Sequence, residues 1–480
     1  MQVKQPLLIT LEPKIFEILS ELNLSGFQPL IVGGAVRDAL LGIEPKDIDI
    51  EVYKISYSKL SEILSKHGRV DLVGQKFGVI KFSSKDCEMD YDFSIPRKEN
   101  KSGVGHTEFE ITFDENITIK EAAERRDFTI NALAWSCFTG EIFDFFGGID
   151  DLNNKTLRHT SEKFVEDLLR ILRAMQFQSR FNFEIHPSTI KLIKEILQAG
   201  EFELLSKERV FEEWFKWAEK GVHHDLIFKF MNDTGLIKFY PLLDALKYTE
   251  QDKIWHPEGN VEIHTELCLK QIDKIVEREN ITGKEKAVLV MSVLLHDVAK
   301  PLCTEIKEKH GRMCVTSEGH EQMGKMVSIE FLQRIGFYEE LISPIEKLVA
   351  NHLFGVSANN IPSISGKVKA VKKLSKRLHP ATIKQLMYVM DADTNGRGGT
   401  EWKEPTGHKE LSEIAVELSV TEKQYEFLLF GRHLIKKGLK PGLIFGTILK
   451  QAEEAQINGE FGDLEGAEKW LDEYLLITMK

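Results

Sequence analysis

The organisation of this chain is set near its N-terminus by Leu30-Ile31-Val32-Gly33-Gly34-Ala35-Val36-Arg37-Asp38-Ala39-Leu40-Leu41-Gly42, followed by Lys46-Asp47-Ile48-Asp49-Ile50-Glu51-Val52. The pattern predicts a strand, a glycine turn, a short helix and a second strand. Because side chains alternate between the faces of a strand, Asp47 and Asp49 should share one face, opposite Ile48 and Ile50. Two neighbouring carboxylates suit Mg²⁺, which keeps several waters and takes further oxygens from phosphates.

The glycines and the arginine of this segment favour the metal site over its alternative, an edge strand with solvated acids. Gly33 and Gly34 let the backbone approach the phosphates of a nucleotide, and Arg37 can bind them. Asp92 is a candidate third carboxylate, because residues 89–97 again alternate between polar and apolar. A solvated strand acid is the alternative for Asp92. Residues 97–107 are polar and basic and contain glycines, which predicts a mobile loop. Because it lies between two active-site strands, we interpret it as a lid, with an ordinary surface loop as the alternative.

The bulk composition excludes several classes of protein. A length of 480 residues suits about three domains. The net charge of −12 argues against a wholly basic surface, although a local basic groove suffices to bind RNA. The sequence has no apolar run of transmembrane length, no signal-peptide core and no Cys-x-x-Cys pair among its five cysteines. We expect a cytoplasmic protein with reduced cysteines and no membrane contact.

A second motif covers residues 121–134, Glu-Ala-Ala-Glu-Arg-Arg-Asp-Phe-Thr-Ile-Asn-Ala-Leu-Ala. Its helical spacing predicts that Asp127 and Asn131 lie on one face, with Arg126 beside them. Arg126 suits a triphosphate, and Asp127 and Asn131 suit a ribose hydroxyl or an orienting hydrogen bond. A solvated helix face is the alternative.

A third motif, in residues 161–175, predicts a helix with Asp167 and Arg170 together on one face. A carboxylate can accept a hydrogen bond from the exocyclic amine of cytosine or adenine, whereas guanine and uracil present a carbonyl oxygen there. Asp167 and Arg170 can therefore select CTP and ATP without a nucleic-acid template. A simple salt bridge is the alternative. Arg173 can reach phosphate or RNA.

From about residue 255 the sequence becomes helical and rich in histidine. His264, His296, His320 and His352 each fall near a helix end, and Asp297 follows His296 directly. One histidine on an apolar helix is usually a core residue, but four together with an aspartate indicate a metal site. Residues 367–377 are the most basic window of the chain, either a solvated face or a contact with a nucleic-acid backbone.

The motifs of residues 30–52, 121–134 and 161–175 resemble those of the class II CCA-adding enzymes (tRNA nucleotidyltransferases) and of the related bacterial poly(A) polymerases. The resemblance implies template-independent addition of CMP and AMP to the 3′ end of tRNA from CTP and ATP, with Mg²⁺ as cofactor. It implies that Glu-Asp-x-x-Arg, here ending in Arg170, is a protein template. It also places Arg209 in the neck as a brace for that helix.

Residues 251–400 resemble the HD phosphohydrolase domain, which carries phosphatase and cyclic phosphodiesterase activity in some CCA enzymes. The implied ligands of a divalent transition metal are His264, His296, Asp297 and Asp393, with Asp391 as an alternative to Asp393. The resemblance further implies that two more histidines line a second metal or the phosphate. Ala299 departs from the glycine that is usual in the family.

The resemblance implies an α+β fold in four parts: a nucleotidyltransferase head with a small mixed sheet (1–158), an all-α neck with the nucleotide-selecting helix (159–250), the HD domain (251–400) and a helical tail (401–480). A poly(A) polymerase or a partial CC- or A-adding enzyme is the nearest alternative. An HD-driven phosphohydrolase with a non-catalytic, RNA-holding head is an alternative of another class. The sequence leaves open the activity and metal of the HD domain and the oligomeric state.

Overall fold

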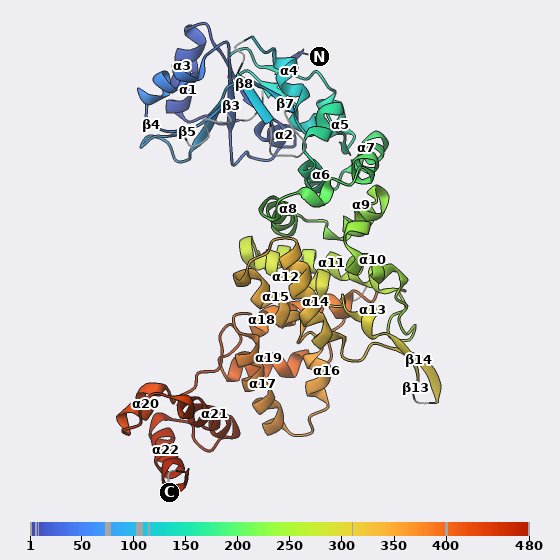
Figure 1. Ribbon diagram of the computed structural model, residues 1–480, viewed down its shortest axis with the longest axis vertical. Coiled ribbons are helices and arrows are strands. Elements are labelled where there is room, and N and C mark those ends of the chain that lie inside the picture. Colours follow the sequence, from blue (N-terminus) through green and yellow to red (C-terminus); the bar gives the residue numbers. More distant parts are fainter. Residues whose placement is uncertain are drawn as a thin grey trace. The chain divides into compact units, whose positions relative to one another are not determined.

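The computed structural model describes residues 2–4, 7, 9–72, 78–101, 109–113, 116–309, 311–398 and 402–478. The chain divides into two compact units, Met1–Phe239 and Tyr240–Lys480, each of which is described here by itself. Figure 1 labels helices and strands of both units. The α+β class predicted from the sequence is confirmed, since strands gather in the first unit and helices dominate the second. The finer division into four parts stays a prediction.

The first unit is built on a mixed eight-stranded sheet, in the spatial order β1-β10-β9-β2-β3-β6-β5-β4. Two smaller pairings, the antiparallel β7–β8 and the parallel β11–β12, lie outside it. The strands are β1 (Gln2–Lys4), β2 (Gln28–Val32), β3 (Asp49–Tyr53), β4 (Arg69–Asp71), β5 (Val79–Ser83), β6 (Tyr91–Ser94), β7 (Arg97–Lys101), β8 (Phe109–Phe113), β9 (Ala134–Trp135), β10 (Glu141–Phe143), β11 (Thr156–Leu157) and β12 (Glu184–Ile185).

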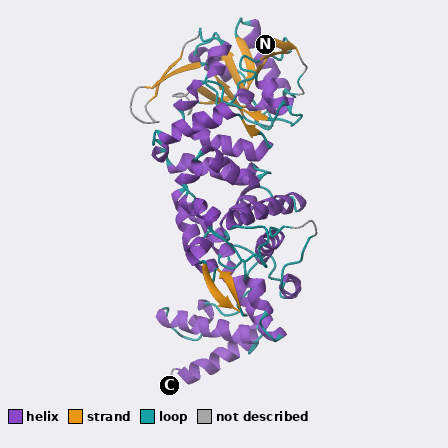
Figure 2. Ribbon diagram, turned by 90° about the vertical axis from the view of Figure 1, so that its right-hand side faces the viewer, coloured by secondary structure: helices purple, strands orange, loops and turns teal. Residues whose placement is uncertain are grey.

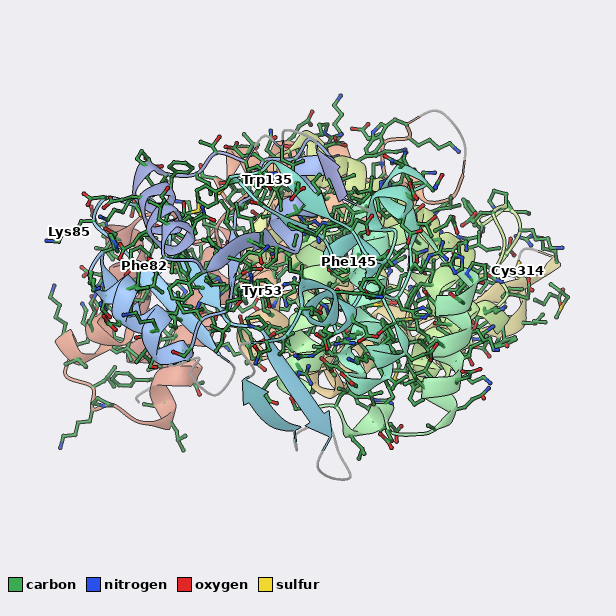
Figure 3. The ribbon with its side chains drawn as sticks, turned by 90° about the horizontal axis from the view of Figure 1, so that it is seen from above. Tyr53, Phe82, Lys85, Trp135, Phe145 and Cys314 are labelled. Atoms are coloured by element: carbon green, nitrogen blue, oxygen red, sulfur yellow. The ribbon has the colours of Figure 1, made fainter. Side chains whose placement is uncertain are left out.

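Strand β3 forms because its apolar side chains alternate with acids. Ile50 and Val52 are fully buried, whereas Asp49 is exposed, as the sequence predicts. Tyr53 of β3 and Phe82 of β5 are also buried, and both are labelled in Figure 3. The observed strand begins at Asp49, so it is shorter than predicted, and Asp47 lies just before it.

Helices of the first unit cover the sheet and continue into a helical region in which α6 packs against α8. The helices are α1 (Pro13–Leu24), α2 (Gly34–Leu40), α3 (Tyr57–Ser65), α4 (Ile119–Glu124), α5 (Gly148–Asn153), α6 (Leu169–Phe181), α7 (Pro187–Gln198), α8 (Lys207–Lys220) and α9 (Ile227–Thr234). Short 3₁₀ turns at Thr129–Asn131 and Glu162–Glu166 precede β9 and α6.

Two local predictions are wrong, and a third is wrong in part. The helix expected over 121–134 ends at Glu124, and Asn131 lies in the 3₁₀ turn. The helix expected over 161–175 begins only at Leu169, because Asp167 has an extended backbone. The loop expected over 97–107 begins as β7, and residues 102–108 lie outside the described part of the chain.

The second unit is almost entirely helical, with the β13–β14 hairpin as its only described sheet (Figure 2). Its elements are α10 (Pro241–Asp244), α11 (Val261–Arg278), α12 (Gly283–Leu295), α13 (Lys300–Cys303), β13 (Glu305–Lys309), β14 (Arg312–Thr316), α14 (His320–Arg334), α15 (Glu339–Val349), α16 (Phe354–Asn359), α17 (Ile364–Leu378), α18 (Ile383–Asn395), α19 (His408–Glu417), α20 (Gly431–Lys436), α21 (Leu443–Asn458) and α22 (Leu464–Thr478).

Helix α12 is the centre of this unit, because it is buried on all sides from Lys286 to Leu295. A helix that is apolar all round requires neighbours on every face. Here α11, α15 and α18 supply them. Among the helices that the structure describes, none combines the length and apolar composition needed to cross a lipid bilayer.

The basic window of the sequence forms α17, and its lysines contact neighbouring helices and aromatic rings. Lys373 lies 2.9 Å from Glu454, and Lys376 pairs with Glu453, both acids being on α21. Lys372 lies over the ring of Tyr425, 4.7 Å from its centre. These lysines therefore contact α21 and the segment before it, and the tRNA contact of this window stays a prediction.

Candidate functional site

The acids of the first motif gather at one edge of β3. Asp49 pairs in register with Asp92 on the parallel strand β6, which brings the candidate third carboxylate beside the first two. The pKa of the Asp49 carboxyl is raised, first by partial loss of hydration and then by the like charges of Asp92, Asp47 and Glu51, against the opposing effect of Arg126. Crowded carboxylates of this kind favour a bound cation, because it relieves their mutual repulsion.

Gly33 allows Arg126 to lie against the first turn. Its φ of +70° suits glycine, and a Cβ at this position would lie 2.6 Å from Nη1 of Arg126. The same guanidinium lies 3.9 Å from Glu51 on β3, the strand that carries Asp49. The structure therefore brings Gly33 and Arg126 together beside the acids. Gly34, the first residue of α2, follows directly.

Arg37 is buried, with 4% of its surface exposed, so it is not in a position to meet a phosphate in this conformation. Its Nε donates to Asp38 at 2.7 Å, and its Nη1 donates to the Asn131 side chain at 2.6 Å. The rings of Phe177 and Phe181 on α6 lie 5.3 and 4.9 Å from the guanidinium carbon. This placement favours a bracing role over the phosphate contact expected from the sequence.

Asp127 joins the second motif to helix α6. Its Oδ1 accepts from the Asn131 amide at 2.9 Å, and its Oδ2 accepts from Nε of Arg173 at 2.7 Å. Burial by itself would raise the pKa of Asp127, but Arg173 and the hydrogen bonds from Asn131 and the Phe128 amide outweigh it and lower the pKa. The predicted proximity of Asp127 and Asn131 is thus found, although no α-helix produces it.

Asp167 precedes α6 and is held from two sides. Its Oδ1 accepts from the backbone amide of Leu169 at 3.1 Å, and its Oδ2 accepts from Nη2 of Arg209 at 2.7 Å. Arg209 lies on α8, so the brace expected in the neck is in contact with the carboxylate. A carboxylate has about four acceptor positions, which leaves capacity for a donor from a ligand.

Arg170 makes no ion pair with Asp167; carbonyl groups orient its guanidinium instead. Nη1 donates to the Lys163 carbonyl at 2.7 Å, and Nη2 donates to the Arg125 carbonyl at 2.6 Å. Arg125 is the direct neighbour of Arg126, which lies beside the strand acids. One short segment therefore contacts both the acid-bearing strand and the pair expected to select the base.

The histidines of the second unit have their ring nitrogens oriented by acceptors. Nδ1 of His296, His320 and His352 lies 2.6–2.7 Å from the carbonyl oxygen three residues earlier, and Nδ1 of His264 lies 2.8 Å from Glu258. Because a carbonyl oxygen only accepts, each of the first three Nδ1 atoms carries a hydrogen, which in the neutral imidazole leaves the lone pair on Nε2. This is the orientation in which histidine binds a metal.

These Nε2 atoms converge on the buried carboxylate of Asp297. Its Oδ2 lies 3.2 Å from His296 and 3.6 Å from His264, while its Oδ1 lies 3.1 Å from His320 and 3.8 Å from His352. The Nε2 atoms of His264 and His296 are 3.3 Å apart, and those of His320 and His352 are 3.2 Å apart. Facing lone pairs repel at such distances, so a cation between them fits the donor set.

The structure also separates the two candidate aspartates on α18. Asp393 lies 3.1 Å from Nε2 of His264, whereas Asp391 lies 3.1 Å from Nε2 of His408 and does not join the cluster. Burial raises the pKa of Asp391 to about 7. Lys300 lies 2.6 Å from Oδ2 of Asp297 and neutralises part of the charge of that carboxylate.

Comparison with known proteins decides the family. Residues 30–158 match the family model described as Poly A polymerase head domain. The multifunctional CCA protein of Pasteurella multocida is 32% identical over 381 residues, which cover 77% of this chain and 84% of the relative. That of Mannheimia succiniciproducens is 32% identical over 405 residues, covering 82% and 91%. This chain belongs to the multifunctional CCA protein family.

Solved structures of CCA-adding enzymes share the fold over nearly the whole chain. The Bacillus stearothermophilus CCA-adding enzyme in complex with CTP has a TM-score of 0.65 at 20% identity, covering 98% of this chain and 99% of that one. The Thermotoga maritima CCA-adding enzyme complexed with tRNA(CCA) has a TM-score of 0.56 at 20% identity, covering 97% and 96%. The relatives at 32% identity confirm the resemblance of the sequence to the class II CCA-adding enzymes, and these structures confirm the fold.

Sequence reasoning missed two members of the histidine cluster in this CCA protein. Cys268 is buried beside His264, and the spacing of four residues on one helix is the signal that could have found it. Glu258 accepts from His256 and His264, whose hydrogen bonds overcome the effect of burial and lower its pKa to about 2. A lone glutamate in a loop carries no such signal.

The Asp127–Arg173 pair should carry much of the stability of the first unit. Replacing Asp127 with Asn removes the nearer of the two carboxylates that neutralise the Arg173 guanidinium and leaves only Glu213 at 3.9 Å, so we expect the free energy of unfolding to fall by about 3 kcal/mol. That is the low end for a buried pair, because Arg173 is one-third exposed. Urea unfolding followed by tryptophan fluorescence measures the change.

The matched control is Asp233→Asn, which breaks an exposed ion pair with Lys229 and should change stability by less than about 0.5 kcal/mol. Because the folded-state pKa of Asp127 is lowered, its contribution is present above the unfolded pKa and fades as the pH falls through the folded value. The difference between wild type and Asp127→Asn should therefore shrink below about pH 4. Equal stability of wild type and Asp127→Asn at neutral pH would contradict the stabilising role of the Asp127–Arg173 pair.

Proposed function

We propose that this protein adds C, C and A to the 3′ end of tRNA, using CTP and ATP and no nucleic-acid template. Membership of the multifunctional CCA protein family supports the activity. The observation that carries the proposal is the continuity of the first unit's site: Arg126 lies beside the acids of β3, and the Arg125 carbonyl holds Arg170. Catalysis and nucleotide choice thus share one contiguous site.

The reaction is the transfer of a nucleotide to the terminal ribose hydroxyl, which attacks the α-phosphorus while pyrophosphate leaves. Asp47 and Asp49, with Asp92 beside them, are the residues that fit a divalent cation, and we propose Mg²⁺. When bound, the cation lowers the pKa of the attacking hydroxyl and neutralises charge on the leaving group. Gly33 and Gly34 admit the triphosphate, and Arg126 binds it.

Nucleotide choice rests on Asp167 and Arg170. The carboxylate of Asp167, fixed by Arg209 and the Leu169 amide, accepts a hydrogen bond from the exocyclic amine of cytosine or adenine. Arg170, oriented by two carbonyls, donates to the ring nitrogen or to the cytosine carbonyl. Asp127, Asn131 and Arg173 hold this helix against the catalytic segment, and Arg173, with one-third of its side chain exposed, is the member able to touch the nucleotide or RNA.

The proposal is tested with tRNA transcripts that end before C, CC and CCA, each incubated with one labelled nucleotide at a time. We expect wild type to add C, C and then A and to stop there. Asp49→Asn should lose incorporation by at least about a hundredfold, because it removes a charge that holds the cation, while tRNA binding persists. Asp86→Asn, an exposed acid away from β3, is the control and should retain full activity.

Each other outcome points to a specific alternative. Repeated addition of A would indicate a poly(A) polymerase, and addition of only C or only A would indicate a partial enzyme. No incorporation by wild type, together with opening of a 2′,3′-cyclic phosphate, would indicate an HD-driven hydrolase whose head only holds RNA. Full activity of Asp49→Asn would contradict the assignment of the strand acids.

We propose a second function for the histidine cluster, hydrolysis of phosphate esters such as a 2′,3′-cyclic phosphate with a divalent transition metal. Support comes from the convergence of four Nε2 atoms on Asp297, which places its two oxygens toward two pairs of histidines. Imidazole ligands suit Zn²⁺, Co²⁺ or Ni²⁺ better than Mg²⁺. When bound, such an ion supplies a nucleophilic water at neutral pH.

Hydrolysis of a 2′,3′-cyclic nucleotide in the presence of Co²⁺ or Ni²⁺ tests this second function. His320→Ala should reduce the rate by about a hundredfold or more, because it removes a cluster donor, and CCA addition should be unchanged. His379→Ala, an exposed histidine of the same unit, is the control and should hydrolyse normally. The second function is wrong if wild type hydrolyses nothing with any of these ions, or if His320→Ala hydrolyses as fast as wild type.

A further inference from the structure

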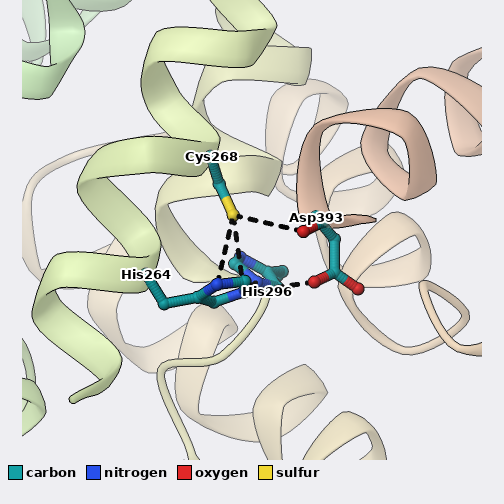
Figure 4. Close-up of side chains that lie close together, drawn as sticks. All are labelled: His264, Cys268, His296 and Asp393. Atoms are coloured by element: carbon teal, nitrogen blue, oxygen red, sulfur yellow. Dashed lines mark hydrogen bonds and ion pairs between the residues drawn. The ribbon is translucent and has the colours of Figure 1, made fainter. Parts of the chain in front are cut away.

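Cys268 lies in the histidine cluster, although no feature of an HD motif calls for a cysteine there. It follows His264 by one turn of α11, on the same face of the helix, and it is fully buried. Its Sγ lies 3.4 Å from Nε2 of His264 and 3.9 Å from the backbone carbonyl oxygen of Asp393. Figure 4 shows the sulfur directed at His264, His296 and the end of α18 that carries Asp393.

The spacing of the donor atoms is that of ligands around one ion. His264 Nε2 lies 3.3 Å from His296 Nε2, 3.1 Å from Asp393 Oδ1 and 3.4 Å from the sulfur. The donor atoms of these four residues all lie within 4.8 Å of one another. Bonds of the usual length to a tetrahedral Zn²⁺ place nitrogen, oxygen and sulfur ligands about 3.3–3.6 Å apart. The sulfur therefore lies at the distance of a co-ligand.

The packing behind the sulfur fixes its position. Gly396, which ends α18, has no side chain, and a Cβ there would lie 2.2 Å from Sγ of Cys268. Gly396 has an ordinary backbone conformation, so its lack of a side chain serves this close approach. A buried structural cysteine normally lies among apolar groups, whereas this sulfur faces two imidazoles and a carboxylate.

We propose that Cys268 is a ligand of the metal at this site, bound as a thiolate together with His264, His296 and Asp393. The inference rests on the second function proposed above, which requires a metal in the histidine cluster. On binding, the S–H bond breaks, a sulfur–metal bond forms and the proton passes to solvent; no electron is transferred. A thiolate ligand selects Zn²⁺, Co²⁺ or Ni²⁺ over Mg²⁺.

A thiolate at one position makes the two halves of the cluster chemically different. The first half, which consists of His264, Cys268, His296 and Asp393, contains sulfur. The second half, which consists of Asp297, His320 and His352, offers only oxygen and nitrogen. Asp297 lies between the halves, with one oxygen toward each. The sulfur-containing half should consequently fill first when a thiolate-accepting ion is limiting, and Mg²⁺ should not compete for it.

Titration of the metal-free, full-length protein with Co²⁺ tests the proposal. Wild type should develop a near-ultraviolet charge-transfer band from thiolate to Co²⁺, and Cys268→Ser should lack it. The variant should also bind Co²⁺ about tenfold or more weakly, because it loses a ligand. Cys314→Ala is the matched control: this cysteine of the β13–β14 hairpin, labelled in Figure 3, is also buried but outside the cluster, so the band should persist.

X-ray absorption of the Zn²⁺-loaded wild type provides a second reading that needs no variant. It should show one sulfur at about 2.3 Å from the metal. If wild type binds Co²⁺ without the band, and Zn²⁺ without a sulfur neighbour, Cys268 is not a ligand and the hydrolase site stands without it. If wild type binds neither ion, the proposed hydrolase function fails together with this inference. Circular dichroism of the metal-free Cys268→Ser variant verifies its fold.

Discussion

A buried chain of polar contacts, Arg37–Asn131–Asp127–Arg173, is the constraint on which the first unit depends. Arg37 donates to Asn131, Asn131 donates to Asp127, and Asp127 accepts from Arg173. The four residues come from α2, a 3₁₀ turn, the segment before it and α6. Each buried charge requires its neighbour, so these elements keep one relative position.

That fixed position determines where the reactive groups lie. The segment that carries Asp127 also carries Arg125 and Arg126, and these contact Arg170 on one side and Glu51 on β3 on the other. Asp49 lies on the same strand as Glu51. A protein that chooses its nucleotide with side chains requires such rigidity, because a base is selected only by donors and acceptors held in place. The second unit uses the same device, since backbone carbonyls fix three imidazoles around Asp297.

The sequence predicted those features that depend on local periodicity. Alternation along residues 47–52 correctly placed Asp49 opposite the buried Ile50 and Val52, whereas Asp47 lies ahead of the strand. The same reasoning failed for residues 121–134 and 161–175, because hydrogen bonds to residues on other elements hold Asp127 and Asp167 outside the helices. Arginine is a residue type that often binds phosphate, but the guanidinium of Arg37 packs against two aromatic rings of α6, which is far from it in the sequence.

Contacts between residues that are far apart in the sequence could not be predicted from its periodicity. The lysines of α17 form a basic window in the sequence, but their acidic partners are about 80 residues away on α21. The family resemblance proposed Asp393 as a ligand, with Asp391 as the alternative. Only the packing of α11 against α18 shows that Asp393, and not Asp391, lies beside His264. The cysteine of the cluster could have been found from its spacing to His264, since both lie on one face of α11.

The central claim is that one site in the first unit holds the cation with the strand acids and reads the base with Asp167 and Arg170. A crystal structure of the protein with CTP and Mn²⁺, using anomalous scattering to locate the metal, tests it most directly. We predict a manganese peak between Asp47 and Asp49 and a cytosine amine within hydrogen-bonding distance of the Asp167 carboxylate. A metal bound away from these acids, or a cytosine that contacts neither Asp167 nor Arg170, would contradict the account.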